Sequence, residues 1–203
     1  MYIGSGDVKA LMAGKNTQTH QSLLQRFVSG VKPYYNAKAS PIDALRTGAI
    51  LEDRYLLSLP LWFVSQYHVV SDEMNVFKAS IDFGEVKDGE LVDFHELKSV
   101  SFMDYIENIQ PLKGDNDALL AFVKKKYKAY YYQVQEQLYC SGLDSCYLVF
   151  LCVTSYDDDE NNARVITDDD VTRVRIFRDE KVINEIKERG LIFQKIKDYY
   201  ECK

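Results

Sequence analysis

Apolar positions in the first quarter of the chain recur with the spacing of helices. This spacing predicts three helices, at residues 7–13, 22–28 and 41–57. Gly30 follows the second helix, and glycine commonly ends helices because it tolerates a positive φ. Pro41 can open the third, since proline is accepted in the first helical turn. Residues 1–66 are therefore predicted to form a helical N-terminal part.

From residue 67 onward the apolar period changes to that of strands. Strands are predicted at residues 67–70, 76–83, 91–100, 147–154, 164–166 and 171–177. The pair Asp88-Gly89 predicts a tight hairpin, because both residues accept the positive φ of a type I′ turn. Helical spacing returns at residues 117–140 and 179–199. This order predicts an α/β fold, with a mixed central β-sheet flanked by helices in one domain over residues 1–203. Residues 67–203 would hold the sheet.

Composition excludes several classes of protein. A hydrophobic fraction of 46% with 28% charged residues is typical of a globular chain, not a disordered or fibrous one. No apolar run approaches the roughly 20 residues that cross a bilayer. The N-terminus lacks the basic and apolar segments of a secretory signal, and four cysteines are too few for a disulfide scaffold. We therefore expect a cytoplasmic protein without membrane association.

The net charge of −6 is unevenly distributed. Residues 1–50 carry six Lys and Arg against two Asp and Glu, whereas residues 51–150 carry nine against sixteen. A basic first quarter suggests a polyanionic partner, and an acidic middle suggests carboxylates that bind a metal. Scattered surface charge is the simpler alternative.

The segment with the clearest chemical content runs from Asp82 to Glu96-Leu97-Lys98. Along a strand, Glu96 and Lys98 share one face while His95 and Leu97 point to the other. The hairpin would bring Asp82 and Glu96 onto neighbouring strands. Two carboxylates and the Leu97 main-chain carbonyl would form an all-oxygen site suited to Mg²⁺ or Mn²⁺. Such a metal activates water against a phosphodiester, and Lys98 could orient that water or neutralise developing charge.

Taken alone, this spacing is weak evidence, because it arises often by chance in a charged chain. The alternative is a surface hairpin with a Glu–Lys pair. Further features strengthen the hypothesis: Glu52 on the helix before the sheet, Asp72 on the incoming strand, and lysines at residues 124–128 ahead of a Tyr- and Gln-rich helix.

Together these segments resemble the phage lambda exonuclease and YqaJ-type viral recombinase family, within the PD-(D/E)xK nuclease superfamily. The family's Arg-Gly-x-x-x-Glu helix, Asp-Glu pair, Ser-Pro-Asp-Gly strand, Glu-Leu-Lys strand and Tyr-x-x-Gln-Val-Gln helix have counterparts here in the same order. These are residues 47–52, 72–73, 80–84, 96–98 and 130–135. The sequence departs from the pattern at Ile81, where the family has proline, and at Phe83, which shifts the glycine.

The resemblance implies a restriction-endonuclease-like fold and assigns roles residue by residue. The implied catalytic residues are Asp82, Glu96, Lys98, Gln133 and Glu52. Asp82, Glu96 and the Leu97 carbonyl would bind the metal, with Asp72 as a support or at a second metal site. Gln133 would help to hold the water or the scissile phosphate.

DNA contacts are less well defined by the resemblance. Tyr130 is expected near the site. The family's basic residue for the 5′-phosphate has no counterpart, and the candidates to replace it are Lys9, Lys15 and Arg26. For these three residues, ordinary exposed charge is an equal alternative.

The activity implied by the resemblance is that of a Mg²⁺-dependent DNA exonuclease, with Mn²⁺ as a substitute. It would act 5′→3′ on the ends of linear double-stranded DNA and leave 3′ single-stranded tails for phage-type recombination. The resemblance also implies a homotrimer around a DNA channel, a single-strand annealing protein as partner, and a phage or prophage origin in a bacterial cytoplasm. The alternatives are another PD-(D/E)xK endonuclease or repair nuclease, and a catalytically silent DNA-binding module. The joint presence of Asp82, Glu96, Lys98 and Gln133 argues against the silent module.

Overall fold

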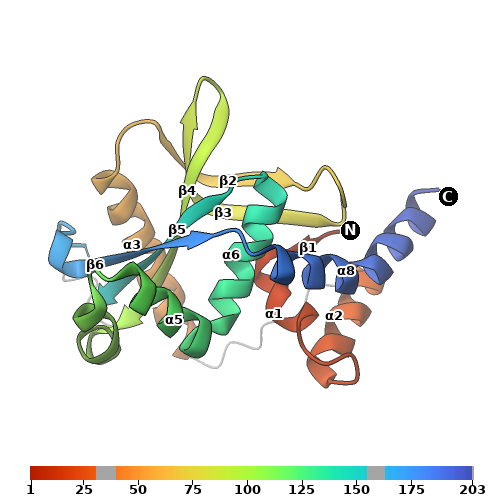
Figure 1. The fold of residues 1–203 in the computed structure, drawn as a ribbon, viewed down its shortest axis with the longest axis horizontal. Helices are drawn as coiled ribbons and strands as arrows, with labels where there is room; N and C mark the ends of the chain where they lie inside the picture. The colour runs from red at the N-terminus through yellow and green to blue at the C-terminus, as the bar shows by residue number, and fades with distance from the viewer. Residues whose placement is uncertain (31–39, 155–162, 203) are drawn as a thin grey trace.

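The computed structural model describes residues 1–30, 40–154 and 163–202, with only the backbone described for 40–45. It contains a six-stranded mixed sheet with strand order β1-β3-β4-β5-β6, and β2 pairs with β3 (Figure 1). The strands are β1 (Ile3–Gly4), β2 (Phe63–Val70), β3 (Phe77–Lys87), β4 (Glu90–Ser101), β5 (Ser145–Val153) and β6 (Val171–Phe177). The predicted α/β fold class is confirmed.

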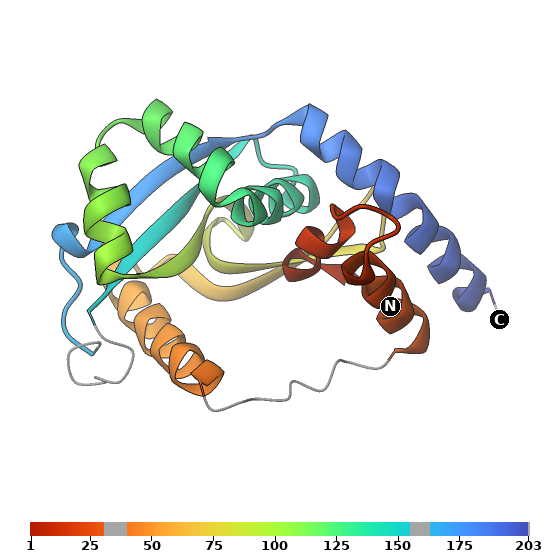
Figure 2. The same ribbon diagram turned by 90° about the horizontal axis from the view of Figure 1, so that it is seen from below.

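Helices cover both faces of the sheet (Figure 2). Their bounds are α1 (Val8–Leu11), α2 (Gln18–Ser29), α3 (Ser40–Ser58), α4 (Phe102–Asp104), α5 (Asn116–Lys126), α6 (Lys128–Ser141) and α8 (Glu180–Glu201). Helix α3 packs Leu51 and Tyr55 on one face, and α5 and α6 pack Leu119, Val134 and neighbouring residues on the other. No helix in the described ranges is long and apolar enough to cross a membrane.

Local sequence signals account for several element ends. Gly30 ends α2 with φ +68°, and Asp88 and Gly89 join β3 to β4 with φ +52° and +86°. Thr17 and Asp179 cap α2 and α8 by accepting a hydrogen bond from a main-chain N–H of the first turn. The predicted hairpin and the predicted end of α2 are therefore confirmed.

One edge of β3 is shared by two strands that do not meet. Lys78 pairs with β1 on one side and β2 on the other, and Phe83 pairs with both β2 and β4. Strands β1 and β4 therefore lie along the same edge of β3, where β1 pairs with residues 77–78 and β4 with residues 83–87. Between them, no strand in the described part of the chain pairs with residues 79–82 on this edge. We call this stretch the β3 gap.

The long helix predicted at residues 117–140 is two helices, because the chain breaks at Tyr127 (φ −114°, ψ 41°). The Tyr127 ring packs against Phe150 and stacks on Tyr130, and its hydroxyl donates to Asp104. Apolar residues keep helical spacing across the break, so the pattern does not reveal it. Residues 102–112, for which no element was predicted, form helical turns.

Two further sequence predictions are wrong. Residues 164–166 form no strand: Arg164 pairs with Asp170, and the chain leads into a 3₁₀ turn at Asp168–Asp170. Residues 1–66 are not purely helical either, since they contain β1 and the start of β2. The acidic residues 157–160, where the sequence pattern between two predicted strands indicates a loop, lie outside the described residues.

Candidate active site

The candidate site lies at the β3 gap. After the Phe83–His95 pair, β3 and β4 no longer pair, and β4 continues alongside β5. The Leu97 N–H donates instead to the Asp82 carboxylate, at 2.9 Å from N to Oδ2. The hairpin therefore brings Asp82 next to the Glu96-Leu97-Lys98 segment, as the sequence predicted.

A local irregularity turns Asp82 into the gap. Ile81 packs in the core under α5 and α6, whereas Phe83, two residues on, packs in the core under α3. Regular alternation would place both on one face, so the alternation breaks at Asp82. On β2, Gln66 stands opposite with φ +55° and is missing from the ladder. The irregularity leaves the Asp82 side chain beside the sheet edge, where it contacts β4.

Glu96 is the most heavily contacted group of the site. Its side chain is 1% exposed, and three nitrogen donors bind its two oxygens. The Lys98 ammonium and the Gln133 amide each lie 2.5 Å from Oε1, and the Gln137 amide lies 2.6 Å from Oε2. Both glutamines lie on α6 one turn apart, so they face the same side of that helix. Gln137 was missed in the sequence analysis, although its spacing from Gln133 places it on the same face.

Burial and charge repulsion dominate the electrostatics. Burial, and then the neighbouring Glu96, raise the pKa of Asp82 to about 8. Burial and Glu96 also raise the pKa of Glu52, which α3 brings to the same site. Burial alone would lower the pKa of Lys98, but Glu96 and Asp82 outweigh it and raise that pKa. Three carboxylates thus surround one ammonium, and a further cation would relieve their repulsion.

The donor set fits Mg²⁺ or Mn²⁺. In the described ranges no group of three or more His, Cys, Asp or Glu side chains is arranged to hold a metal. Mg²⁺ does not need such a cage, because it keeps several waters and is bound by one or two carboxylates together with substrate phosphates. Asp82, Glu96 and the Leu97 carbonyl supply hard oxygen donors of that kind. Their chemistry therefore suits the metal that the sequence analysis expected.

Tyr130 holds Lys98 in place. The Lys98 ammonium lies 5.2 Å from the centre of the Tyr130 ring, a cation–π distance. Tyr127 stacks on the same ring at 5.4 Å with an interplanar angle of 14°. The Tyr130 ring therefore contacts both the Lys98 ammonium and Tyr127, the residue at the helix break. Its position next to the site agrees with the sequence expectation.

Four predicted residues are not brought to Asp82 and Glu96. Asp72 is exposed in the turn between β2 and β3, not on the incoming strand. Lys9 and Lys15 are exposed in or just after α1, and Arg26 on α2 pairs with Asp7 at 3.0 Å. Asp72 follows the end of β2, where Val70 pairs with Lys78 of β3. Asp82 lies four residues beyond Lys78, about 13 Å further along β3, so Asp72 is too distant from Asp82 to share its site.

His95 lies on the opposite face of β4 from Glu96. Its Nδ1 is 2.9 Å from the Tyr55 hydroxyl, and the ring packs against Phe63 and Tyr147. Burial lowers its pKa to about 4, so the ring is neutral at pH 7. These contacts give His95 a structural role on the face opposite Glu96, where strand alternation predicts it.

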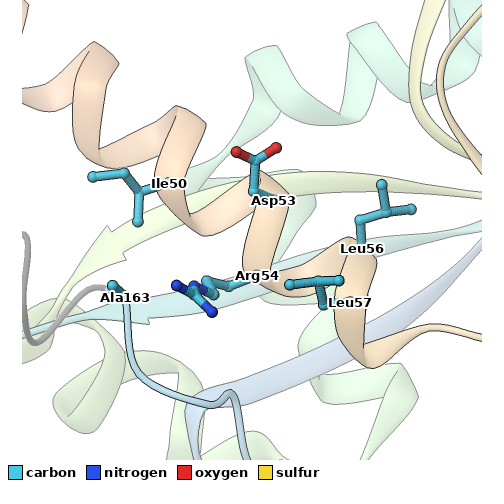
Figure 3. A pocket seen from close by; sticks show the side chains of 6 residues that line it. All are labelled: Ile50, Asp53, Arg54, Leu56, Leu57 and Ala163. Atoms are coloured by element: carbon cyan, nitrogen blue, oxygen red, sulfur yellow. The ribbon is translucent and has the colours of Figure 1, made fainter.

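A shallow hollow on the outer side of α3 is separate from this site (Figure 3). Its lining residues are Ile50, Asp53, Arg54, Leu56, Leu57 and Ala163. None of them is a predicted site residue, and Glu52 and Tyr55 point from α3 toward the sheet. The hollow therefore adds nothing to the candidate chemistry.

Comparison with solved structures relates this geometry to known proteins. The alkaline exonuclease LHK-Exo from Laribacter hongkongensis superimposes with a TM-score of 0.64, at 19% identity over 98% of this chain and 90% of that one. A phage-related exonuclease from Haemophilus somnus 129PT gives 0.59, at 16% identity over 100% and 96%. The chain has the fold of these exonucleases. LHK-Exo in complex with dAMP gives 0.61, at 19% identity over 98% and 90%.

The expected restriction-endonuclease-like fold is thus supported along the whole length of the chain. No protein-family model matches the sequence, and no curated protein matches it. At these identities the comparison shows the shared fold, so the argument for chemistry rests on the residues of the site.

Proposed function

We propose that this chain is a metal-dependent deoxyribonuclease. The observation that carries the proposal is the convergence of Asp82, Glu96, Lys98 and Gln133 at the β3 gap, within a fold shared with exonucleases. An isolated surface hairpin would not bury Glu96 to 1% exposure or surround it with three donors. The site has carboxylates for a cation and a nearby ammonium for a phosphate.

The site residues have distinct roles in this proposal. Asp82, Glu96 and the Leu97 carbonyl would hold Mg²⁺, which when bound supplies Lewis-acid activation of water and phosphate. The Lys98 ammonium stabilises negative charge on the reacting phosphate. Gln133 donates through Nε2 to Glu96, and its Oε1 is left to accept a hydrogen bond from the attacking water.

We further propose that the substrate is the end of linear double-stranded DNA and that degradation runs 5′→3′. The similarity to exonucleases along the whole chain supports action at ends, and dAMP, with which LHK-Exo was solved, is the kind of mononucleotide that an exonuclease releases. Release from the 5′ end would leave 3′ single-stranded tails for phage-type recombination and for an annealing protein.

Another PD-(D/E)xK nuclease, acting on internal bonds or with other polarity, is the second candidate. The same four residues would serve an endonuclease, because they act on the phosphodiester and not on the end. A catalytically silent DNA-binding module fits less well, since such a module has no need for a buried ion pair beside a second carboxylate.

The decisive experiment incubates the purified protein with linear duplex labelled at the 5′ or 3′ end and with closed circular duplex, with Mg²⁺ or with EDTA. We expect Mg²⁺-dependent loss of the 5′ label first and no cut in the circle. Cleavage of the circle would favour the endonuclease, and no cleavage in any reaction would overturn the proposal.

Asp82→Asn should lower the cleavage rate at least 10²-fold while the circular dichroism spectrum stays unchanged, because the substitution removes a metal ligand. The matched control is Asp117→Asn, the same change at an exposed residue of α5. A folded Asp82→Asn protein with wild-type activity would contradict the assignment of the site.

A further inference from the structure

Gln137 differs from Gln135, the other buried glutamine of α6. Its side chain is fully buried, and its Nε2 donates to Glu96 Oε2 at 2.6 Å and to the Ser80 carbonyl at 2.9 Å. Both partners can only accept, so the orientation of the amide is fixed. Its Oε1 is buried without a hydrogen-bond partner in the described structure. One amide thus ties Glu96 of β4 to the unpaired main chain of β3, at an energetic cost to the fold.

Gln135 provides an internal comparison. It is also fully buried on α6, but both of its amide atoms are partnered. Its Nε2 donates to the Phe177 carbonyl at 2.9 Å, and its Oε1 accepts from the Asp179 N–H at 2.8 Å. Gln135 therefore joins β6 to the start of α8 as a satisfied structural amide. Gln137, in contrast, leaves its Oε1 acceptor unpaired, while its Nε2 contacts Glu96 of the candidate site.

The contact with Gln137 limits where the Glu96 carboxylate can bind a cation. A carboxylate offers about four lone-pair positions, two on each oxygen. Lys98 and Gln133 occupy Oε1, and Gln137 occupies one position of Oε2. The position that remains for a cation is on Oε2, the oxygen that Gln137 holds. The direction of that oxygen is therefore set from α6 through Gln137.

We propose that Gln137 is a positioning residue that sets the metal affinity of the site by fixing Glu96 Oε2 across the β3 gap. The proposal rests on the proposed function, because it concerns the same carboxylate. Hydrogen bonds to a ligating carboxylate typically change metal affinity or activity by 10- to 100-fold when they are removed. Gln137 acts through Glu96 and is not expected to touch DNA.

The test compares Gln137→Met with Gln135→Met, since methionine keeps the unbranched shape of glutamine and removes the hydrogen bonds. Isothermal calorimetry with Mn²⁺ measures metal affinity, and thermal denaturation in EDTA measures stability. We expect Gln137→Met to bind Mn²⁺ about 10- to 100-fold more weakly and to need correspondingly more Mn²⁺ for cleavage, with an unchanged KM for DNA. Gln135→Met should lose stability and keep wild-type Mn²⁺ affinity.

Equal Mn²⁺ affinity in Gln137→Met and the wild type would overturn the inference and leave the proposed nuclease function standing. A wild-type protein that binds Mn²⁺ without cleaving any DNA would overturn the function instead. If Gln137→Met does not fold, a Mg²⁺ titration of the ¹⁵N-labelled wild type replaces it. The Gln137 side-chain amide resonance should shift during the titration, with the same midpoint as in calorimetry, while the Gln135 resonance stays in place. An unshifted Gln137 resonance would contradict the inference.

Discussion

Buried carboxyl groups behave differently depending on what surrounds them. Glu96 has three nitrogen donors, whereas Glu136, also on α6, has as its neighbours the Ser5 hydroxyl and the Cys140 thiol, which donates to its Oε1. Burial raises the pKa of Glu136 to about 7. The two residues show that burial alone does not make a functional carboxylate: one is supplied with donors for its charge, and the other is favoured as the neutral acid.

Glu136 gives a pH dependence of stability. Because its folded pKa of about 7 exceeds its ordinary value of 4.5, its contribution to stability is fully present below pH 4.5 and is lost as the pH rises through 7. Glu136→Gln, which resembles the neutral acid, should therefore stabilise the protein at pH 8 by about 3 kcal/mol and much less at pH 5.

Thermal or urea denaturation of both proteins in EDTA at pH 5 and pH 8 would measure this difference. The comparison with the variant isolates Glu136 from Asp82, whose raised pKa has the same sign. An equal stability difference at the two pH values would show that Glu136 is not neutral in the folded state.

The elements that follow local rules could be predicted from the sequence. The β3–β4 hairpin follows from Asp88-Gly89, and the end of α2 from Gly30, since each depends on one residue's backbone preference. Asp82 could be brought next to Glu96 by the hairpin, and Glu96 and Lys98 share a face by strand alternation. Gln133, on a separate helix, is indicated only by the family resemblance. Gln137 could have been found from its spacing of four residues from Gln133, which places both on one face of α6. The position of Asp72 depends on where the turn after β2 lies relative to the site, and no local signal carries that information.

Helix α8 packs unusually close to β3, and the composition of the two elements does not reveal this approach. Helix α8 crosses β3 at Gly190, where an added Cβ would lie 2.3 Å from the Phe77 ring. Phe77 is fully buried and has little room to move. Gly190 is therefore required by a close approach of helix and sheet, and not by backbone flexibility.

Gly190→Ala should destabilise the protein by about 1–3 kcal/mol, the usual cost of overpacking a core. Gly48→Ala is the matched control, because among the described residues no atom outside the adjacent helix backbone lies within 4 Å of the added Cβ, and alanine is the better helix former. Chemical denaturation should give opposite signs for the two variants. A stabilising Gly190→Ala would mean that α8 can move away from β3.

At the scale of the whole molecule, a chain of net charge −6 attracts DNA weakly over long distances. An exonuclease must nevertheless remain on its substrate. A ring of three copies with the basic residues 1–50 facing a central channel would concentrate positive charge around the duplex, and repeated heterologous contacts can close such a ring.

As the resemblance to the phage lambda exonuclease family implies, we predict a homotrimer in solution, DNA binding that weakens steeply with salt, and processive digestion. Light scattering at micromolar concentration measures the mass, and addition of unlabelled competitor DNA during digestion measures processivity. A monomer mass together with immediate transfer to the competitor would refute the ring.

The β3 gap has a consequence for how the protein becomes active. Its partners come from distant parts of the chain: Ser5 Oγ accepts from the Ser80 N–H across 75 residues, and Gln137 reaches the Ser80 carbonyl across 57. Closing contacts this far apart in sequence costs more chain entropy than forming hairpins or helices, so we expect these contacts to form later in folding. A partly folded chain would then have its β3–β4 hairpin but not the long-range contacts that fix Ser80 and Glu96. On the proposed function, the enzyme is unable to cut DNA until its own folding is complete.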